Sequence, residues 1–155
     1  MSDEQSVALS ELLDEREIHR ALSRFARIAD AKLFDDLGEV FADDVTFDYG
    51  AGENQQGIAQ LRQLLRGHLE RCGGTQHLIG SIIVDVDGDR AVSQAYVQAR
   101  HQRAGDFVGP VFDTNGEYTD RWEKRTAGWR IVRRDACWSV VTGDATILAV
   151  EDVPR

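Results

Sequence analysis

Three residues of this sequence have side chains and positions that suit proton transfer, namely Asp30, His77 and His101. An imidazole titrates near neutral pH, so it can take a proton and return it within one turnover. His77 opens a long apolar run, and Asp30 falls on the expected buried side of an amphipathic helix. A carboxylate there is costly unless it is paired. Bonded to one ring nitrogen of His77, it would fix the tautomer and leave the other nitrogen basic.

Each of these residues also has a simpler explanation. Asp30 could lie at a frayed, solvated helix end, because an unpaired aspartate is seldom buried. His77 and His101 could each be a core histidine satisfied by a backbone carbonyl. The other two histidines, His19 and His68, have polar neighbours and are expected at the surface.

Three helices are expected in the first half of the chain. Apolar residues recur at three- and four-residue spacing over residues 7–29, which predicts a long amphipathic helix that carries Asp30 at its end. A shorter helix should begin near Phe34 and end at the Asp43-Asp44 pair. A third helix is expected from Ile58 to Cys72, ended by Gly73-Gly74.

The rest of the chain is typical of strands. Residues 45–49, 76–86, 91–103, 112–124 and 129–141 are apolar, β-branched or alternating. In the third of these segments, Ala99 and His101 fall on the inward face. Helices followed by strands indicate an α+β fold, in which three helices of the N-terminal half cover the concave face of a curved antiparallel or mixed sheet. Such a cup leaves an apolar pocket between its layers, where ligand sites tend to lie.

The turn near Gly88 decides whether the two histidines share a face. If Asp87-Gly88 formed a two-residue turn, His77 and His101 would point to opposite faces. In a three-residue loop over residues 86–88, glycine takes the left-handed position that suits it. His77 then lies opposite Val97 and about 13 Å from His101 along the strands, at roughly 3.3 Å per residue. A bulge or strong curvature would shorten that gap.

Composition excludes several classes of function. The net charge of −9 argues against nucleic acid and anionic membranes as partners, because both reward clustered Lys and Arg. No stretch approaches the roughly 20 apolar residues of a membrane helix. The acidic start resembles no signal peptide, and the two distant cysteines favour reduced thiols, so we expect a cytoplasmic protein with one domain over residues 1–155. No metal or nucleotide motif is present, so we expect neither metal nor cofactor.

Several segments resemble the SnoaL-like family of the nuclear-transport-factor-2-like superfamily, and within it scytalone dehydratases most. The matching pieces are Ile28-Ala29-Asp30 with the following Phe34 to Leu37, Asp48-Tyr49, Thr75-Gln-His-Leu-Ile-Gly80 and His101-Gln-Arg103. The Asp and His pattern is also similar to that of hexachlorocyclohexane dehydrochlorinase and bile-acid 7α-dehydratase.

The resemblance implies a cone-shaped α+β barrel and cofactor-free elimination of a leaving group β to an acidic C–H. By that analogy His77 is the base, Asp30 supports it, Tyr49 polarises a substrate carbonyl and His101 assists in the pocket. Either histidine would then protonate the departing hydroxyl. We expect the substrate pocket to include Phe25, Tyr118 and Trp138.

The chain departs from the dehydratase pattern at four positions. Ala29 and Phe25 stand where the family has tyrosines, and Glu117 and Thr119 replace a serine and an asparagine of the pocket. These differences affect the expected substrate more than the proton transfer.

The sequence therefore predicts a dehydratase-like carbon–oxygen lyase acting on a small hydrophobic cyclic or polycyclic substrate, polyketide- or steroid-like. Similar cups also host isomerases and polyketide cyclases, and some serve as non-catalytic binding or assembly modules. An open curved sheet has a convex face to cover, so we expect a homo-oligomer. The resemblance favours a trimer over a dimer.

Overall fold

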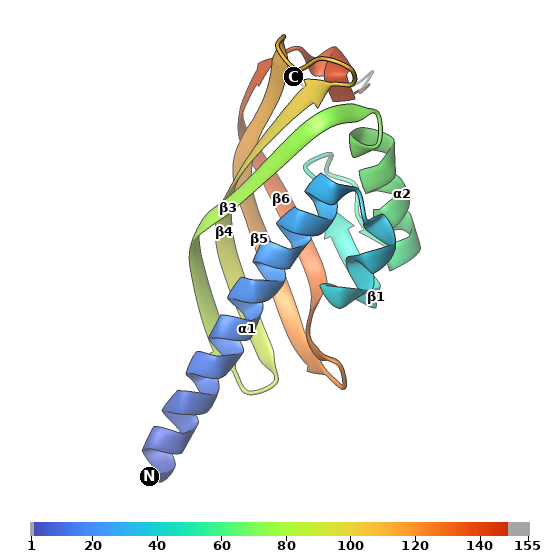
Figure 1. The fold of residues 1–155 in the computed structure, drawn as a ribbon. Coiled ribbons are helices and arrows are strands. Elements are labelled where there is room, and N and C mark those ends of the chain that lie inside the picture. The colour runs from blue at the N-terminus through green and yellow to red at the C-terminus, as the bar shows by residue number, and fades with distance from the viewer. Residues whose placement is uncertain (1, 149–155) are drawn as a thin grey trace.

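The structure is a computed structural model that describes residues 2–148, in which helices cover one face of a curved six-stranded sheet (Figure 1). The helices are α1 (Asp3–Ala31), the 3₁₀ helix η1 (Phe34–Glu39), α2 (Ile58–Leu69) and the 3₁₀ helix η2 (Ala145–Leu148). The strands are β1 (Phe41–Asp48), β2 (Gln55–Gln56), β3 (Cys72–Asp87), β4 (Arg90–Arg103), β5 (Val111–Arg125) and β6 (Gly128–Gly143).

The strand order is β2-β1-β6-β5-β4-β3, and only β1 and β6 are parallel. The long strands β3 to β6 follow one another as antiparallel neighbours. Figure 1 shows the sheet as a curved half-cone with α1, η1 and α2 on its concave side. The alternation expected in β4 is present, since Ala95, Val97 and Ala99 are buried on that side. The predicted α+β fold with a mixed sheet and three covering helices is confirmed.

Helix α1 carries Asp30 to the site. A capping box between Ser2 and Gln5 begins the helix, and Lys32 ends it in the left-handed conformation. Its buried face extends to Ile28 and Ala29, so Asp30, the next residue, lies at the edge of the core. No helix of residues 2–148 is both long and apolar enough to cross a membrane.

Two predicted helix ends were wrong. The second helix is a short 3₁₀ helix that ends at Glu39, and the Asp43-Asp44 pair lies within β1. There the chain pairs with β6 and buries Val45 and Phe47 on alternate positions. Helix α2 ends at Leu69, and Cys72 begins β3 because the residues after it pair with the end of β4.

Both turns considered between β3 and β4 were wrong as well. Asp87 faces Arg90, so the turn consists of Gly88 and Asp89. An unbroken ladder from this turn would set His77 opposite Arg100, on the outer face. A register shift between Gly80 and Ile83 inserts one extra residue in β3, a β-bulge. His77 consequently faces Ala99 on the inner face.

Candidate active site

Asp30 and His77 form a direct pair between the end of α1 and strand β3. The Asp30 carboxylate accepts a hydrogen bond from His77 Nδ1 at 2.7 Å and another from the His77 backbone N–H at 3.0 Å. The Thr75 hydroxyl donates a third at 3.1 Å. The side chain of Asp30 is 22% exposed and that of His77 is 6% exposed. The carboxylate is therefore held by three donors rather than solvated at a frayed helix end.

These contacts determine the tautomer of His77. An ionised carboxylate only accepts hydrogen bonds, so Nδ1 carries the proton and Nε2 presents its lone pair. Partial burial alone would raise the pKa of Asp30, but the hydrogen bonds and charge of His77 lower it below its ordinary value. Asp30 thus stays ionised and can stabilise an imidazolium at His77.

His101 lies next to His77 on the same face of the sheet. The two ring centroids are 5.8 Å apart with an interplanar angle of 86°. The expected separation of about 13 Å at roughly 3.3 Å per residue was wrong, because the observed turn and the bulge together place His77 opposite Ala99 and not opposite Val97. Both imidazoles therefore reach one site.

His101 is buried and is held in its neutral state. It is 2% exposed, and its Nδ1 lies 2.8 Å from the carbonyl oxygen of Phe112. A carbonyl only accepts, so this nitrogen carries the proton. Burial lowers the pKa of His101 to about 4, although the bond to Phe112 opposes that shift. At neutral pH its Nε2 is a hydrogen-bond acceptor.

Tyr49 follows β1 and contributes a phenol to the site. Its ring makes edge contacts with Phe47 and Tyr118, each with centroids 6.1 Å apart. The indole of Trp138 donates to the Tyr49 backbone carbonyl at 2.9 Å and fixes this end of the strand. Burial raises the pKa of Tyr49, so the hydroxyl remains protonated. That hydroxyl donates to no group within residues 2–148 and can serve a ligand.

A buried ion pair that was not predicted from the sequence packs against the rings of Phe25 and Tyr118. Arg134 and Asp120 are joined by two hydrogen bonds of 2.7 Å and are fully buried. The guanidinium lies 4.1 Å from the ring centroid of Tyr118 and 4.4 Å from that of Phe25. The sequence contained one signal for this pair. Asp120 lies two residues after Tyr118 in β5 and therefore on the same, inward face, where a carboxylate needs a cation as its partner.

These residues surround one largely apolar cavity of about 240 Å³. The lining includes all the predicted site residues except Asp30, which lies behind His77. Helix α2 also contributes His68, so its predicted place among surface residues was wrong. His68 follows Leu65 by three residues and thus borders the buried stripe of the helix. The lining includes Phe25, Tyr49, His68, His77, His101, Tyr118 and Trp138.

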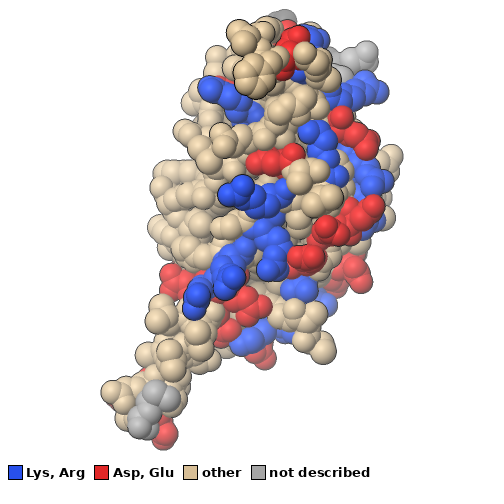
Figure 2. All heavy atoms as spheres, in the orientation of Figure 1, with Lys and Arg blue, Asp and Glu red and all other residues tan. Residues whose placement is uncertain are grey.

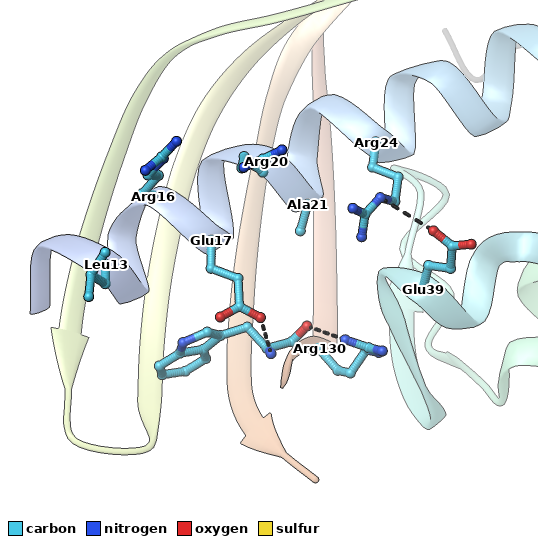
Figure 3. Close-up of a pocket in the computed structure, with 9 residues that line it drawn as sticks. Leu13, Arg16, Glu17, Arg20, Ala21, Arg24, Glu39 and Arg130 are labelled. Carbon is cyan, nitrogen blue, oxygen red and sulfur yellow. Dashed lines mark hydrogen bonds and ion pairs between the residues drawn. The ribbon is translucent and has the colours of Figure 1, made fainter. Parts of the chain in front are cut away.

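A second hollow, between α1, η1 and the start of β6, has a different character (Figure 3). Arg24 pairs with Glu39 at 3.3 Å, and Glu17 accepts the Trp129 backbone N–H at 3.2 Å. Most of its charged side chains are exposed, whereas those of His77 and His101 are buried. No group of three or more potential metal ligands occurs within residues 2–148.

Residues 10–135 match the family model described as the SnoaL-like domain, so the chain belongs to this family. An uncharacterized protein of Mycobacterium tuberculosis, Rv2910c, is 32% identical over 133 residues, which cover 85% of this chain and 90% of that protein.

Two solved structures share the fold. A candidate scytalone dehydratase from Novosphingobium aromaticivorans has a TM-score of 0.79 at 23% identity, covering 87% of this chain and 90% of the other. A nuclear-transport-factor-2-like superfamily protein from Salmonella enterica has a TM-score of 0.74 at 17% identity, covering 87% and 97%. The predicted membership in the SnoaL-like family is confirmed by the family model, and the two structures show the expected fold.

Proposed function

We propose that this protein is a cofactor-independent acid–base enzyme that eliminates water, or a comparable leaving group, from a small cyclic β-hydroxy ketone. The observation that carries the proposal is the 2.7 Å bond between Asp30 and His77 Nδ1 at the wall of an apolar cavity. A carboxylate that orients a histidine in an enclosed site is the arrangement general base catalysis needs. The scytalone dehydratase assignment of a structural neighbour adds an analogy of fold.

In the proposed reaction, His77 Nε2 removes the proton α to the carbonyl. Asp30 stabilises the imidazolium that forms, because it stays ionised beside Nδ1. The Tyr49 hydroxyl donates a hydrogen bond to the enolate oxygen as negative charge develops there. The electron pair of the enolate then expels the β-oxygen and forms the carbon–carbon double bond.

His101 has a supporting part in this proposal. Its pKa of about 4 leaves it unprotonated at neutral pH, so it is a poor donor toward the departing hydroxyl. Its Nε2 can instead accept a hydrogen bond from a substrate hydroxyl and orient the ring beside His77. Of the two histidines expected to protonate the leaving group, His77 and His101, the second is therefore the less suitable donor.

The cavity limits the substrate. Its volume of about 240 Å³ lies just below the range of about 300–1,000 Å³ usual for ligand sites. The rings of Phe25, Tyr118 and Trp138 line it and suit a flat apolar ligand. We therefore propose a substrate with one or two fused rings, in preference to a larger steroid-like molecule.

We further propose that the protein forms a homo-oligomer, with a trimer ahead of a dimer. Leu78, Ile83, Val92 and Tyr96 project from the outer face of β3 and β4, and each is at least 42% exposed. Figure 2 shows the flank over these strands largely free of charged side chains. Sedimentation velocity tests this proposal: a Tyr96→Glu variant should sediment as a monomer, and a wild type that is itself monomeric would contradict it.

A β-hydroxytetralone provides the direct test of the reaction. Its elimination product tautomerises to a fluorescent naphthol, so turnover can be followed continuously. We expect catalysed naphthol formation by the wild-type protein. Exchange of the α-proton for deuterium without naphthol would indicate an isomerase or cyclase, and tight binding without either reaction would indicate a binding module.

A further inference from the structure

The proposed elimination leaves one step without a residue, namely protonation of the departing oxygen. Among the described residues that line the cavity, five side chains have titratable protons. They are Tyr49, His68, His77, His101 and Tyr118. His77 begins the cycle as the base, so the proton must come from one of the other four or from His77 itself after it has taken the α-proton.

Three of the four other side chains are poorly suited to the step. Burial lowers the pKa of His101 to about 4, so it carries no proton to give at neutral pH. Burial raises the pKa values of Tyr49 and Tyr118, which makes both phenols weak acids. Each can donate a hydrogen bond, but neither readily loses its proton. Of these four, only His68 remains, so the donor is either His68 or His77 after it has taken the α-proton.

His68 is oriented by its own helix. It lies in the last turn of α2, and its Nδ1 is 2.8 Å from the carbonyl oxygen of Leu64. Since a carbonyl only accepts, Nδ1 carries a proton in both charge states, and the exchangeable proton belongs to Nε2. The last turn of a helix also favours a cation, because the backbone carbonyls there bear partial negative charge.

The two histidines reach the cavity from different elements. His77 comes from strand β3 and is paired with Asp30, whereas His68 comes from α2 and is bonded only to a neutral carbonyl. The carboxylate keeps Nε2 of His77 basic. His68 has no carboxylate partner, and an imidazole in general can carry a second proton near neutral pH. An elimination needs both a base and an acid, and two histidines with different partners can fill these two roles at the same time.

We propose, on the basis of the function proposed above, that His68 is the proton donor to the leaving group. His77 takes the α-proton, the C–O bond breaks with its electron pair on oxygen, and the Nε2 proton of His68 passes to that oxygen. The products are the unsaturated ketone and water. His77 then loses one proton to solvent and His68 gains one, which restores both residues.

Comparing two substrates with different leaving groups distinguishes protonation of the leaving group from abstraction of the α-proton. Acetate departs as an anion without prior protonation, whereas hydroxide does not. With the β-hydroxytetralone as probe, His68→Gln should lower turnover by about 100-fold or more. With the β-acetoxy analogue, the same variant should stay within about threefold of the wild type. His77→Gln should lower turnover with both probes, because both need the α-proton removed.

Controls keep the outcomes distinct. His19→Gln changes a histidine outside the cavity and should leave both rates unchanged, and added imidazole should partly restore a His68→Ala variant with the hydroxy probe. If His68→Gln lowered both rates equally, or neither, this role of His68 would be wrong while the proposed elimination stood. If the wild-type protein converted neither probe, the proposed function and the role of His68 would both fall.

Discussion

His77 and His101 lie side by side on the inner face of the sheet, with ring centroids 5.8 Å apart, because β3 contains one more residue than β4 between Gly80 and Ile83. Without this bulge every residue of β3 before Gly80 would point to the other face. Asp30 would then meet an outward side chain in place of His77. A single extra residue in a strand thus assembles the proposed site.

The bulge should carry a measurable conformational cost at Ser81. This residue has a φ of 51°, in the left-handed region that glycine adopts more readily than other residues. We expect Ser81→Gly to raise the free energy of unfolding by up to about 1 kcal/mol, and Ser81→Val to lower it by about 1–2 kcal/mol. Urea denaturation measures both. Equal losses for the two variants would show that the backbone conformation is not what limits this position.

The Arg134–Asp120 pair should behave as one unit. Removing one partner leaves the other charge buried and unpaired, so Arg134→Met should lower the free energy of unfolding by about 3–5 kcal/mol. The double variant Asp120→Leu with Arg134→Met removes both charges and should recover most of that loss. A double-mutant cycle from chemical denaturation checks this coupling. Additive losses for the two substitutions would contradict it.

His101 should make stability depend on mildly acidic pH. Its pKa falls from the ordinary 6.5 to about 4 in the folded protein. Between these values the unfolded chain binds a proton that the folded protein does not, so stability is lost as the pH falls from 6.5 toward 4. The loss should reach about 3 kcal/mol, at 1.36 kcal/mol for each pKa unit.

The substitution His101→Gln isolates this contribution. The difference in unfolding free energy between variant and wild type, measured by urea denaturation from pH 7 to about pH 4, should shrink on acidification because only the wild type pays the protonation penalty. A pH-independent difference would show that His101 does not titrate below its usual range.

The sequence predicts the Asp30–His77 pair better than the rest of the site. Helical periodicity puts Asp30 on the buried side of α1, and a buried carboxylate requires a partner. The proximity of His77 and His101 depends on an extra residue near Ser81, and no proline or β-branching pattern marks that bulge. A second register shift, between Arg121 and Trp122, similarly changes which residues of β6 face inward.

That second shift explains why Arg134 was overlooked. Strict alternation from Trp129 would place Arg134 outside, whereas the irregular ladder turns it into the core. His68 was missed for another reason, since its polar neighbours suggested exposure although it borders the apolar stripe of α2. In each case the general fold follows from periodicity, but the direction of a single side chain depends on packing across elements.

The most direct test of the account is the effect of His77→Gln on elimination from the β-hydroxytetralone. Glutamine keeps a polar side chain of similar size but cannot accept the α-proton, so kcat/KM should fall by about 10²–10⁴-fold while the thermal unfolding midpoint changes little. Asp30→Asn should cause a fall of similar direction, because the amide no longer stabilises the imidazolium. Wild-type kcat/KM in a well-folded His77→Gln variant would contradict the central claim that His77 is the base.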